Sequence, residues 1–197
     1  NNLQIICSLL SLQSRYIDDK RYLQFFKETQ NRINSMALMH EKLYRSTDLA
    51  SINTTGYIKE LSESLFASYN IETGIINLKT RIGHIPMDID TAIPLGLIIN
   101  ELVSNALKHA FVKLSKNKKL EIKVEFSKDK KGYLKLVVRD NGIGFPKDLN
   151  FQNTESLGLQ LVCMLVDQLN GSIKIFRREG TRFTITCNLP GTHHDPS

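Results

Sequence analysis

Apolar residues recur at helical spacing over residues 1–45. In residues 1–17 the recurring positions are Leu3, Ile6, Leu9, Leu10 and Ile17. In residues 20–45 they form a heptad seam, spaced alternately by four and three: Tyr22, Phe26, Thr29, Ile33, Met36, His40 and Leu43. Asp18 and Asp19 lie between the two stretches and indicate a turn that starts the second helix. We therefore predict an αα-hairpin. Because a lone hairpin cannot bury both apolar faces, it should pair with a second copy as a four-helix bundle.

A second unit follows a change in composition. Residues 46–54 are mostly small and polar, which indicates a connector. Beyond it the periodicity predicts helices near 55–68, 90–111 and 157–169, and strands at 75–82, 120–126, 134–138, 173–175 and 183–189. Asp88 or Asp90 is the candidate N-cap of the 90–111 helix. Alternating apolar and polar residues in the strands are typical of an antiparallel sheet with one buried face.

The predicted fold class is α+β. The helical hairpin occupies residues 1–48, as half of a dimeric four-helix bundle. An α/β sandwich over residues 52–190 has a mixed, mostly antiparallel sheet with its helices on one face. Residues 191–197 form a tail.

Composition and charge narrow the class of protein. A hydrophobic content of 41% and a charged content of 23% are typical of a soluble globular protein. No apolar run reaches the roughly 20 residues that span a bilayer, and no signal peptide opens the chain. The net charge is +6, but the lysines cluster at 113–119 and 128–131 without interleaved aromatic residues, which favours a solvated surface over a nucleic-acid site. Cys7, Cys163 and Cys187 lie on apolar stretches and predict buried, reduced thiols in a cytoplasmic protein.

Polar side chains form a stripe on the predicted 90–111 helix. Glu101, Asn105 and Lys108 stand at i, i+4 and i+7, with His109 beside them. This spacing places a carboxylate, a carboxamide and an ammonium on one helical face. A solvated helix face would also contain glutamate and lysine, although asparagine is a poor helix former. The stripe alone therefore does not distinguish a site from a solvent-exposed face.

Two glycine-containing segments follow along the chain. Asp140 ends a predicted strand and precedes Asn141-Gly142-Ile143-Gly144, so its carboxylate could accept a hydrogen bond from a purine amino group. A plain hairpin turn would explain Asn141 and Gly142, but not a second glycine that leads into a long loop. Ser156-Leu157-Gly158-Leu159-Gln160-Leu161 opens a helix, whose free N–H groups favour phosphate, although a turn glycine explains this segment equally simply.

Taken together and in this order, these segments resemble the boxes of a known ATPase superfamily. Asn100–Ala110 resembles the N box shared by gyrase, heat-shock protein 90, MutL-type repair proteins and histidine kinases. Asp140–Gly144 resembles the first glycine box, and Ser156–Leu161 resembles the second, with one glycine where many kinases have two. Gly180–Phe183 resembles the start of the last strand. The resemblance covers nearly all of 52–190 and implies the Bergerat ATP-binding fold.

The hairpin is similar to the dimerisation region of the second class of sensor histidine kinases, related to the His-Trp-Glu kinases. The matching segments are Asn1-Asn2-Leu3-Gln4, Ser11–Ser14 and Met36–Tyr44. In that family His-Arg-Val-Lys directly precedes Asn-Asn-Leu-Gln, which places the phosphorylated histidine four residues before Asn1, outside this chain. His40 lies on the heptad seam and is interpreted as a packing residue rather than an acceptor.

The resemblance also implies which residues bind the phosphates of ATP. Asn105 would coordinate Mg²⁺ between them, and Lys108 and His109 would face them. Gly158 and Leu159 would open a helix directed at the same groups.

The same resemblance implies which residues bind adenine. Asp140 would bind the adenine amino group, assisted by Thr181, while Gly142 and Gly144 shape the pocket. Residues 145–155 would form the lid over ATP.

The expected protein is thus the catalytic core of a two-component histidine kinase. It would use ATP and Mg²⁺ to phosphorylate the upstream histidine and then an aspartate of a response regulator. Glu101 is the candidate catalytic residue, placed to orient the acceptor imidazole or a metal-bound water. Expected partners are a second copy through residues 1–45, a receiver domain and an upstream sensor domain, with no nucleic acid and no membrane segment in this chain. Two alternatives remain: a serine kinase of the anti-sigma-factor type, which lacks this hairpin, and a non-catalytic ATP-binding module.

Overall fold

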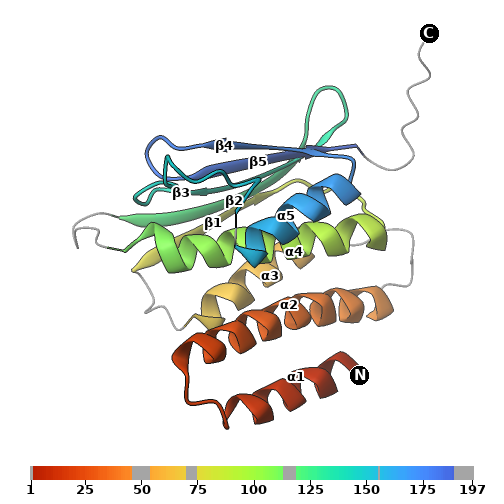
Figure 1. The fold of residues 1–197 in the computed structure, drawn as a ribbon. Coiled ribbons are helices and arrows are strands. Elements are labelled where there is room, and N and C mark those ends of the chain that lie inside the picture. The colour runs from red at the N-terminus through yellow and green to blue at the C-terminus, as the bar shows by residue number, and fades with distance from the viewer. Residues whose placement is uncertain (1, 46–53, 70–74, 113–118, 155, 189–197) are drawn as a thin grey trace.

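The structure is a computed structural model that describes residues 2–45, 54–69, 75–112, 119–154 and 156–188. Figure 1 shows a helical layer beneath a sheet, with a hairpin of two helices below both. In chain order the elements are α1 (Asn2–Ser14), α2 (Lys20–Arg45), α3 (Thr54–Ser68), β1 (Ile76–Ile82), α4 (Ile89–Asn105), the π-helix η1 (Ala106–Ala110), β2 (Leu120–Lys128), β3 (Leu134–Asp140), α5 (Leu157–Gln168), β4 (Ser172–Phe176) and β5 (Arg182–Cys187).

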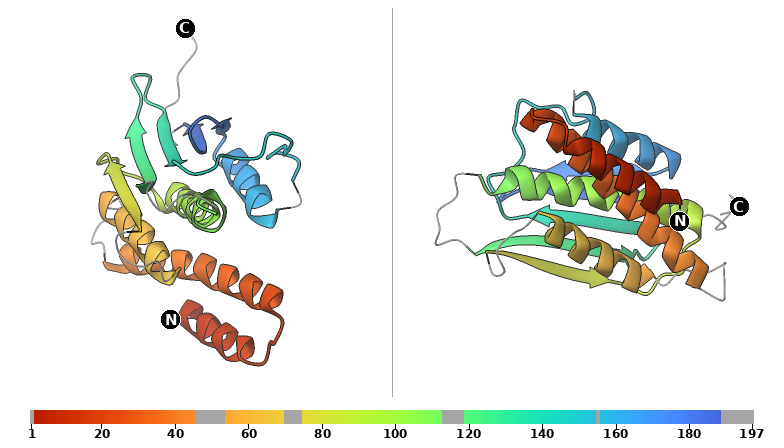
Figure 2. Two further views of the ribbon diagram at one scale, coloured as in Figure 1. Left: turned by 90° about the vertical axis from the view of Figure 1, so that its left-hand side faces the viewer. Right: turned by 90° about the horizontal axis from the view of Figure 1, so that it is seen from below.

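The sheet is mixed and mostly antiparallel, as the sequence predicts. Its strand order is β1-β2-β3-β5-β4, and only the β1–β2 pair is parallel. Helices α3, α4 and α5 cover one face (Figures 1 and 2). The alternation along the strands directs one set of side chains at these helices, and Ile122, Val124 and Phe126 of β2 are fully buried there. This layer of apolar side chains supports α4, which carries the N box.

Helix α4 begins where its cap predicts but does not continue as a regular helix to its end. The Asp88 carboxylate accepts a hydrogen bond from the backbone N–H of Thr91 at 2.8 Å, so Asp88 is the N-cap and Asp90 lies in the first turn. After Asn105 the backbone changes to the π-helix η1, where the sequence predicts one continuous helix. A π-turn contains more residues than an α-turn, so side chains beyond Asn105 no longer follow the α-helical stripe.

The hairpin is antiparallel and packs against the second unit. The Gln30 side chain of α2 donates to the Ser11 hydroxyl of α1 at 2.7 Å, and the Cys7 thiol lies 3.1 Å from Asn34 Oδ1. Helix α2 also contacts α3 and α4, so it lies between α1 and the helical layer (Figure 2). The connector at 46–53, the lysines at 113–118 and the tail at 191–197 lie outside the described residues.

The three cysteines are free, but their burial differs from the prediction. Cys187 is buried on β5, and burial raises the pKa of its thiol to about 11. Cys7 and Cys163 are only partly buried, so the prediction of three buried thiols is wrong for these two. Each lies at the margin of an apolar stripe: Cys7 faces Asn34 across the hairpin, and the Cys163 thiol lies 3.9 Å from the Phe151 carbonyl oxygen.

Candidate functional site

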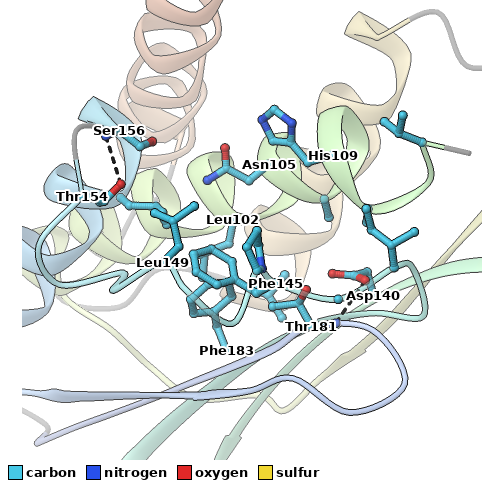
Figure 3. Close-up of a pocket in the computed structure, with 18 residues that line it drawn as sticks. Leu102, Asn105, His109, Asp140, Phe145, Leu149, Thr154, Ser156, Thr181 and Phe183 are labelled. Atoms are coloured by element: carbon cyan, nitrogen blue, oxygen red, sulfur yellow. Dashed lines mark hydrogen bonds between the residues drawn. The ribbon is translucent and has the colours of Figure 1, made fainter.

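A cavity of about 470 Å³ lies at the end of α4, between η1, the loop after β3 and the start of β5. Most of its wall is apolar, with side chains from Leu102, Ala106, Val138, Ile143, Phe145, Leu149, Leu159 and Phe183. Its polar lining comes from Asn105, His109, Asp140, Thr154, Ser156 and Thr181. Figure 3 shows Asp140 and Thr181 at one end, and Thr154 and Ser156 at the other. An apolar cavity with a few convergent polar groups is typical of a small-molecule site.

Asp140 is the buried carboxylate of this cavity. One oxygen, Oδ1, accepts hydrogen bonds from the backbone N–H groups of Gly142 at 2.8 Å and of Thr181 at 3.1 Å. Burial raises the pKa of Asp140, and the hydrogen bonds from Gly142 and Thr181 oppose that rise. The carboxylate is therefore fixed in position by two neighbouring loops. A carboxylate has about four lone-pair sites, so acceptor capacity remains for a ligand.

Gly142 allows the loop after β3 to pass directly against η1. A Cβ added at Gly142 would lie 2.1 Å from the carbonyl oxygen of Ala110, so no side chain fits there. The next residue, Ile143, donates its N–H to the same carbonyl oxygen at 2.8 Å. Gly142 thus joins Asp140 to the end of the N box, although its own atoms do not line the cavity. Gly144 does line the cavity and has a positive φ of 86°.

Asn105 and His109 line the cavity from α4 and η1 (Figure 3). The Asn105 amide carries both an acceptor oxygen and a donor nitrogen, so this residue offers both kinds of group to a ligand in the cavity. Burial lowers the pKa of His109, the charge of Lys108 lowers it further, and the charge of Glu28 opposes the change. Neutral imidazole is therefore favoured at neutral pH.

Aromatic side chains form part of the wall between the two ends. Phe145 packs edge-on against Phe183 with ring centroids 6.0 Å apart, and Phe151 does the same at 6.1 Å. The Arg177 guanidinium lies 5.6 Å from the centre of the Phe145 ring and donates to the Leu149 carbonyl oxygen at 3.0 Å. The sequence interpretation included Phe145 only as the first residue of the predicted lid and Phe183 only as part of the motif at the start of the last strand, and it assigned neither of them to the cavity wall. Their positions beside Gly144 and Thr181 were the available signal.

Thr154 and Ser156 also line the cavity and were missed as individual residues. The Ser156 N–H donates to the Thr154 hydroxyl at 3.1 Å, and the Gln160 side chain donates to the Thr154 carbonyl oxygen at 2.7 Å. These hydrogen bonds hold Thr154 and Ser156, which precede α5, against the first turn of that helix. The amino end of α5 therefore lies at the end of the cavity opposite Asp140 (Figure 3).

Glu101 and Lys108, by contrast, do not line the cavity. The buried Glu101 carboxylate accepts two hydrogen bonds from Arg32 of α2, at 2.7 and 2.8 Å, and one from Asn100 at 3.0 Å. The Lys108 ammonium donates to Glu28 of α2 at 2.6 Å. The hydrogen bond to Glu101 is the main reason why the pKa of Arg32 is raised.

The predicted residues thus divide into two groups. Those that line the cavity are Asn105, His109, Asp140, Gly144, Leu159 and Thr181. Glu101, Lys108, Gly142 and Gly158 lie outside the lining, and Gly158 packs against the Glu101 carboxylate. The π-helix explains why Lys108 lies outside the lining. Its wider turn directs the Lys108 side chain away from the side of the helix on which Asn105 lies.

Comparison with known proteins gives two family matches along the chain. Residues 1–69 match the family described as histidine kinase, and residues 90–191 match the histidine kinase-, DNA gyrase B- and HSP90-like ATPase family. The chain belongs to the histidine kinases. The two matches cover the domains of a sensor kinase core, with the cavity inside the ATPase match.

Individual relatives support the same assignment. The sensor histidine kinase PdtaS of Mycobacterium tuberculosis is 34% identical over 176 residues, which are 88% of this chain and 34% of PdtaS. Blue-light-activated histidine kinase 2 of Erythrobacter litoralis is 24% identical over 195 residues, or 96% of this chain and 54% of that protein. The chain therefore spans only part of these relatives.

A solved structure has the same fold. The histidine kinase domain of a blue-light-activated histidine kinase from Erythrobacter litoralis superposes with a TM-score of 0.75 at 22% identity, covering 96% of this chain and 86% of that one. This likeness confirms the α+β fold, with a helical hairpin followed by a mixed sheet. None of the helices among the described residues combines the length and hydropathy needed to cross a bilayer.

Proposed function

We propose that this chain is the catalytic core of a two-component sensor histidine kinase, which binds Mg-ATP in the cavity. Its γ-phosphate passes to a histidine four residues upstream of Asn1 and then to an aspartate of a response regulator. The observation that carries the proposal is the buried Asp140 carboxylate, anchored by two backbone N–H groups in an otherwise apolar cavity. The match of residues 1–69 to a histidine kinase family favours this function over an anti-sigma-type serine kinase, which lacks the hairpin.

The residues present fit adenine at the Asp140 end. A purine ring has apolar faces and an exocyclic amino group, and this end offers apolar walls and a fixed acceptor. Val138 and Ile143 belong to that wall, and Thr181 stands beside the carboxylate. The remaining lone pairs of Asp140 accept the amino N–H in a charge-assisted hydrogen bond, which distinguishes adenine from a ring without a donor there.

The opposite end suits phosphates and a metal ion. Three or more acidic, histidine or cysteine side chains that could hold a metal do not come together among the described residues. Mg²⁺ is commonly held by one or two protein oxygens together with substrate phosphates and water, and the Asn105 amide oxygen would supply one such ligand. When bound, the ion neutralises charge on the transferring phosphoryl group. The Ser156 hydroxyl and the free N–H groups in the first turn of α5 provide donors for the same anions.

The hairpin is proposed to form a homodimer. Four apolar side chains of α1 are 43–59% exposed, namely Ile5, Ile6, Leu9 and Leu12. Tyr22 and Phe25 of α2 are also exposed. A contiguous apolar surface of this kind is typical of an interface. The receiver domain of a response regulator and an upstream sensor domain complete the proposed set of partners.

The dimer should depend on this apolar face of the hairpin. Leu9→Glu should shift the chain from dimer to monomer in sedimentation experiments at micromolar concentration, because it places a charge inside the apolar interface. Met164→Glu is the matched control, since Met164 is an exposed apolar residue of α5 outside the hairpin. A chain containing the upstream helix that remains monomeric without any substitution would contradict the proposed interface.

Calorimetric titration tests the nucleotide site. The chain should bind ATP with Mg²⁺ at a dissociation constant between micromolar and millimolar, and binding should weaken when the exocyclic amino group of the purine is replaced by a carbonyl. Equal affinity for both purines would remove Asp140 from purine recognition. Binding of ATP without phosphorylation of the upstream histidine would favour the non-catalytic ATP-binding module.

A further inference from the structure

We propose that Glu28 and Arg32 of α2 form an electrostatic latch with Lys108 and Glu101, which holds the ATPase domain away from the acceptor histidine. Phosphoryl transfer then requires release of this latch. The inference rests on the proposed function, because it concerns regulation of the same site.

The latch consists of two ion pairs on one face of α2. Arg32 binds both oxygens of Glu101, at 2.7 and 2.8 Å, and Lys108 binds Glu28 at 2.6 Å. Glu28 and Arg32 are one helical turn apart and lie 4.0 Å from each other. The four groups therefore form a row of alternating charge, in the order Glu101, Arg32, Glu28 and Lys108. Each group has an opposite charge beside it.

Burial makes these contacts stronger than exposed surface pairs. The side-chain exposures are 7% for Glu101, 15% for Arg32, 18% for Lys108 and 22% for Glu28. Salt screens charges in such positions weakly. Helix α5 also closes on the Arg32–Glu101 pair, because a Cβ added at Gly158 would lie 2.3 Å from Glu101 Oε2. The Glu101 carboxylate is thus enclosed by α2, α4 and α5.

The register of the hairpin shows where the latch lies relative to the acceptor. Cys7 of α1 stands opposite Gln30 and Asn34 of α2, which is the level of Arg32. The acceptor proposed upstream of Asn1 precedes Cys7 by about ten residues, or roughly 15 Å along a continued helix. Because α1 runs antiparallel to α2, the proposed acceptor lies beside the carboxyl end of α2. Glu28 lies in the other direction, toward the turn of the hairpin.

Figure 1 shows that the cavity-bearing end of the ATPase domain and the start of α1 lie at opposite ends of the hairpin. The carboxyl end of α4, which carries the cavity, lies near the start of α2, whereas the start of α1 lies at the opposite end of the hairpin. The latch therefore holds the cavity near the turn and away from the proposed acceptor. A γ-phosphate in the cavity could not reach that histidine without movement of the ATPase domain along the hairpin.

The latch also withholds a cation from the nucleotide. Lys108 is the ammonium that the N box would direct at the phosphates, yet it is bound to Glu28 and does not line the cavity. Release of Glu28 makes this ammonium available. Opening the latch therefore has two consequences: the domain can move, and Lys108 can turn toward ATP.

Single substitutions on α2 test the latch in a chain that includes the upstream histidine. Arg32→Gln and Glu28→Gln should each raise the single-turnover rate of histidine phosphorylation at saturating ATP at least threefold. Lys27→Gln and Glu63→Gln remove exposed charges from α2 and α3 and serve as matched controls, with no change expected. Unchanged or slower transfer in both latch variants, with their cooperative melting intact, would overturn the proposal.

Small-angle scattering without nucleotide separates failure of the latch from failure of the proposed function. The Arg32→Gln chain should have a larger radius of gyration than the wild type, because the ATPase domain is no longer held against α2. An unchanged radius for both Arg32→Gln and Glu28→Gln would overturn the latch even if the wild type phosphorylates its histidine. If the Arg32→Gln chain has the larger radius but the wild type does not bind ATP, the ion pairs do hold the two domains together, and the proposed function is wrong.

Discussion

Asp140→Asn should weaken ATP binding roughly ten- to a hundredfold, because the adenine amino group loses a charge-assisted hydrogen bond worth about 1.5–3 kcal/mol. The asparagine side-chain oxygen can still accept the N–H groups of Gly142 and Thr181, so the surrounding loops should keep their positions. Titration calorimetry of the wild type and the variant measures the difference.

The same substitution should not lower the stability of the ligand-free protein. Burial raises the pKa of Asp140 in the folded state above that in the unfolded chain. The unfolded chain therefore loses this proton first as pH rises, and the ionised carboxylate opposes folding above the folded-state pKa. Asparagine removes that opposition, so the melting temperature at pH 7 should stay the same or rise, whereas at low pH the advantage should vanish.

Asp129→Asn is a closely matched control. The exposed Asp129 carboxylate also accepts two backbone N–H groups, from Lys131 at 2.8 Å and Tyr133 at 2.9 Å, but it lies in the turn after β2. This variant should bind ATP as the wild type does. If Asp140→Asn also retained the wild-type affinity, Asp140 would have no place in the nucleotide site.

Glu101→Gln should slow phosphorylation of the upstream histidine at least tenfold while ATP affinity stays within a few fold. A carboxylate that acts as a general base contributes about 10²–10⁴-fold to rate, and Glu101 is absent from the cavity lining, so ground-state binding should not depend on it. Glutamine keeps an oxygen for the hydrogen bond from Arg32 and limits damage to the interface. Single-turnover phosphorylation in a longer chain, alongside calorimetry, separates rate from affinity.

Comparison with Arg32→Gln makes this test sharper. Each variant removes one charge of the Arg32–Glu101 ion pair, yet the two should change the transfer rate in opposite directions. Arg32→Gln frees the Glu101 carboxylate and speeds transfer, whereas Glu101→Gln only weakens the latch and removes the catalytic carboxylate, so transfer slows. A change in the same direction in both variants would indicate a purely structural pair. Lost ATP binding with an unchanged transfer rate would mean that Glu101 holds ligand and has no catalytic role.

The order of the elements could be predicted from the sequence, because their periodicities are strong. The heptad seam of 20–45 coincides with α2, and the alternation around Ile122 and Val124 gives β2 its buried face. The site residues Asp140 and Asn105 were predictable for a different reason: they belong to segments with a recognisable order, and both line the cavity. Local sequence signals were sufficient for these features.

The contacts between distant segments could not be predicted in this way. Arg32 and Glu101 are 69 residues apart, and neither periodicity nor motif spacing indicates that α2 packs on α4. The π-helix after Asn105 was also missed, since the hydrophobic pattern of 90–111 fits a regular α-helix. That difference in turn geometry displaced Lys108 from the predicted stripe. The positions of Phe145 and Phe183 in the cavity wall were missed because apolar residues signal burial without showing which of them face a cavity.

Labelled ATP and a chain extended to include the upstream histidine test the central claim most directly. The extended chain should acquire acid-labile, base-stable phosphate on that histidine, dependent on Mg²⁺ and lost in Asp140→Asn at limiting ATP. The chain of residues 1–197 alone should acquire none, including on His40. Acid-stable phosphate on serine, label on His40, or no transfer by an extended chain that binds ATP would contradict the account.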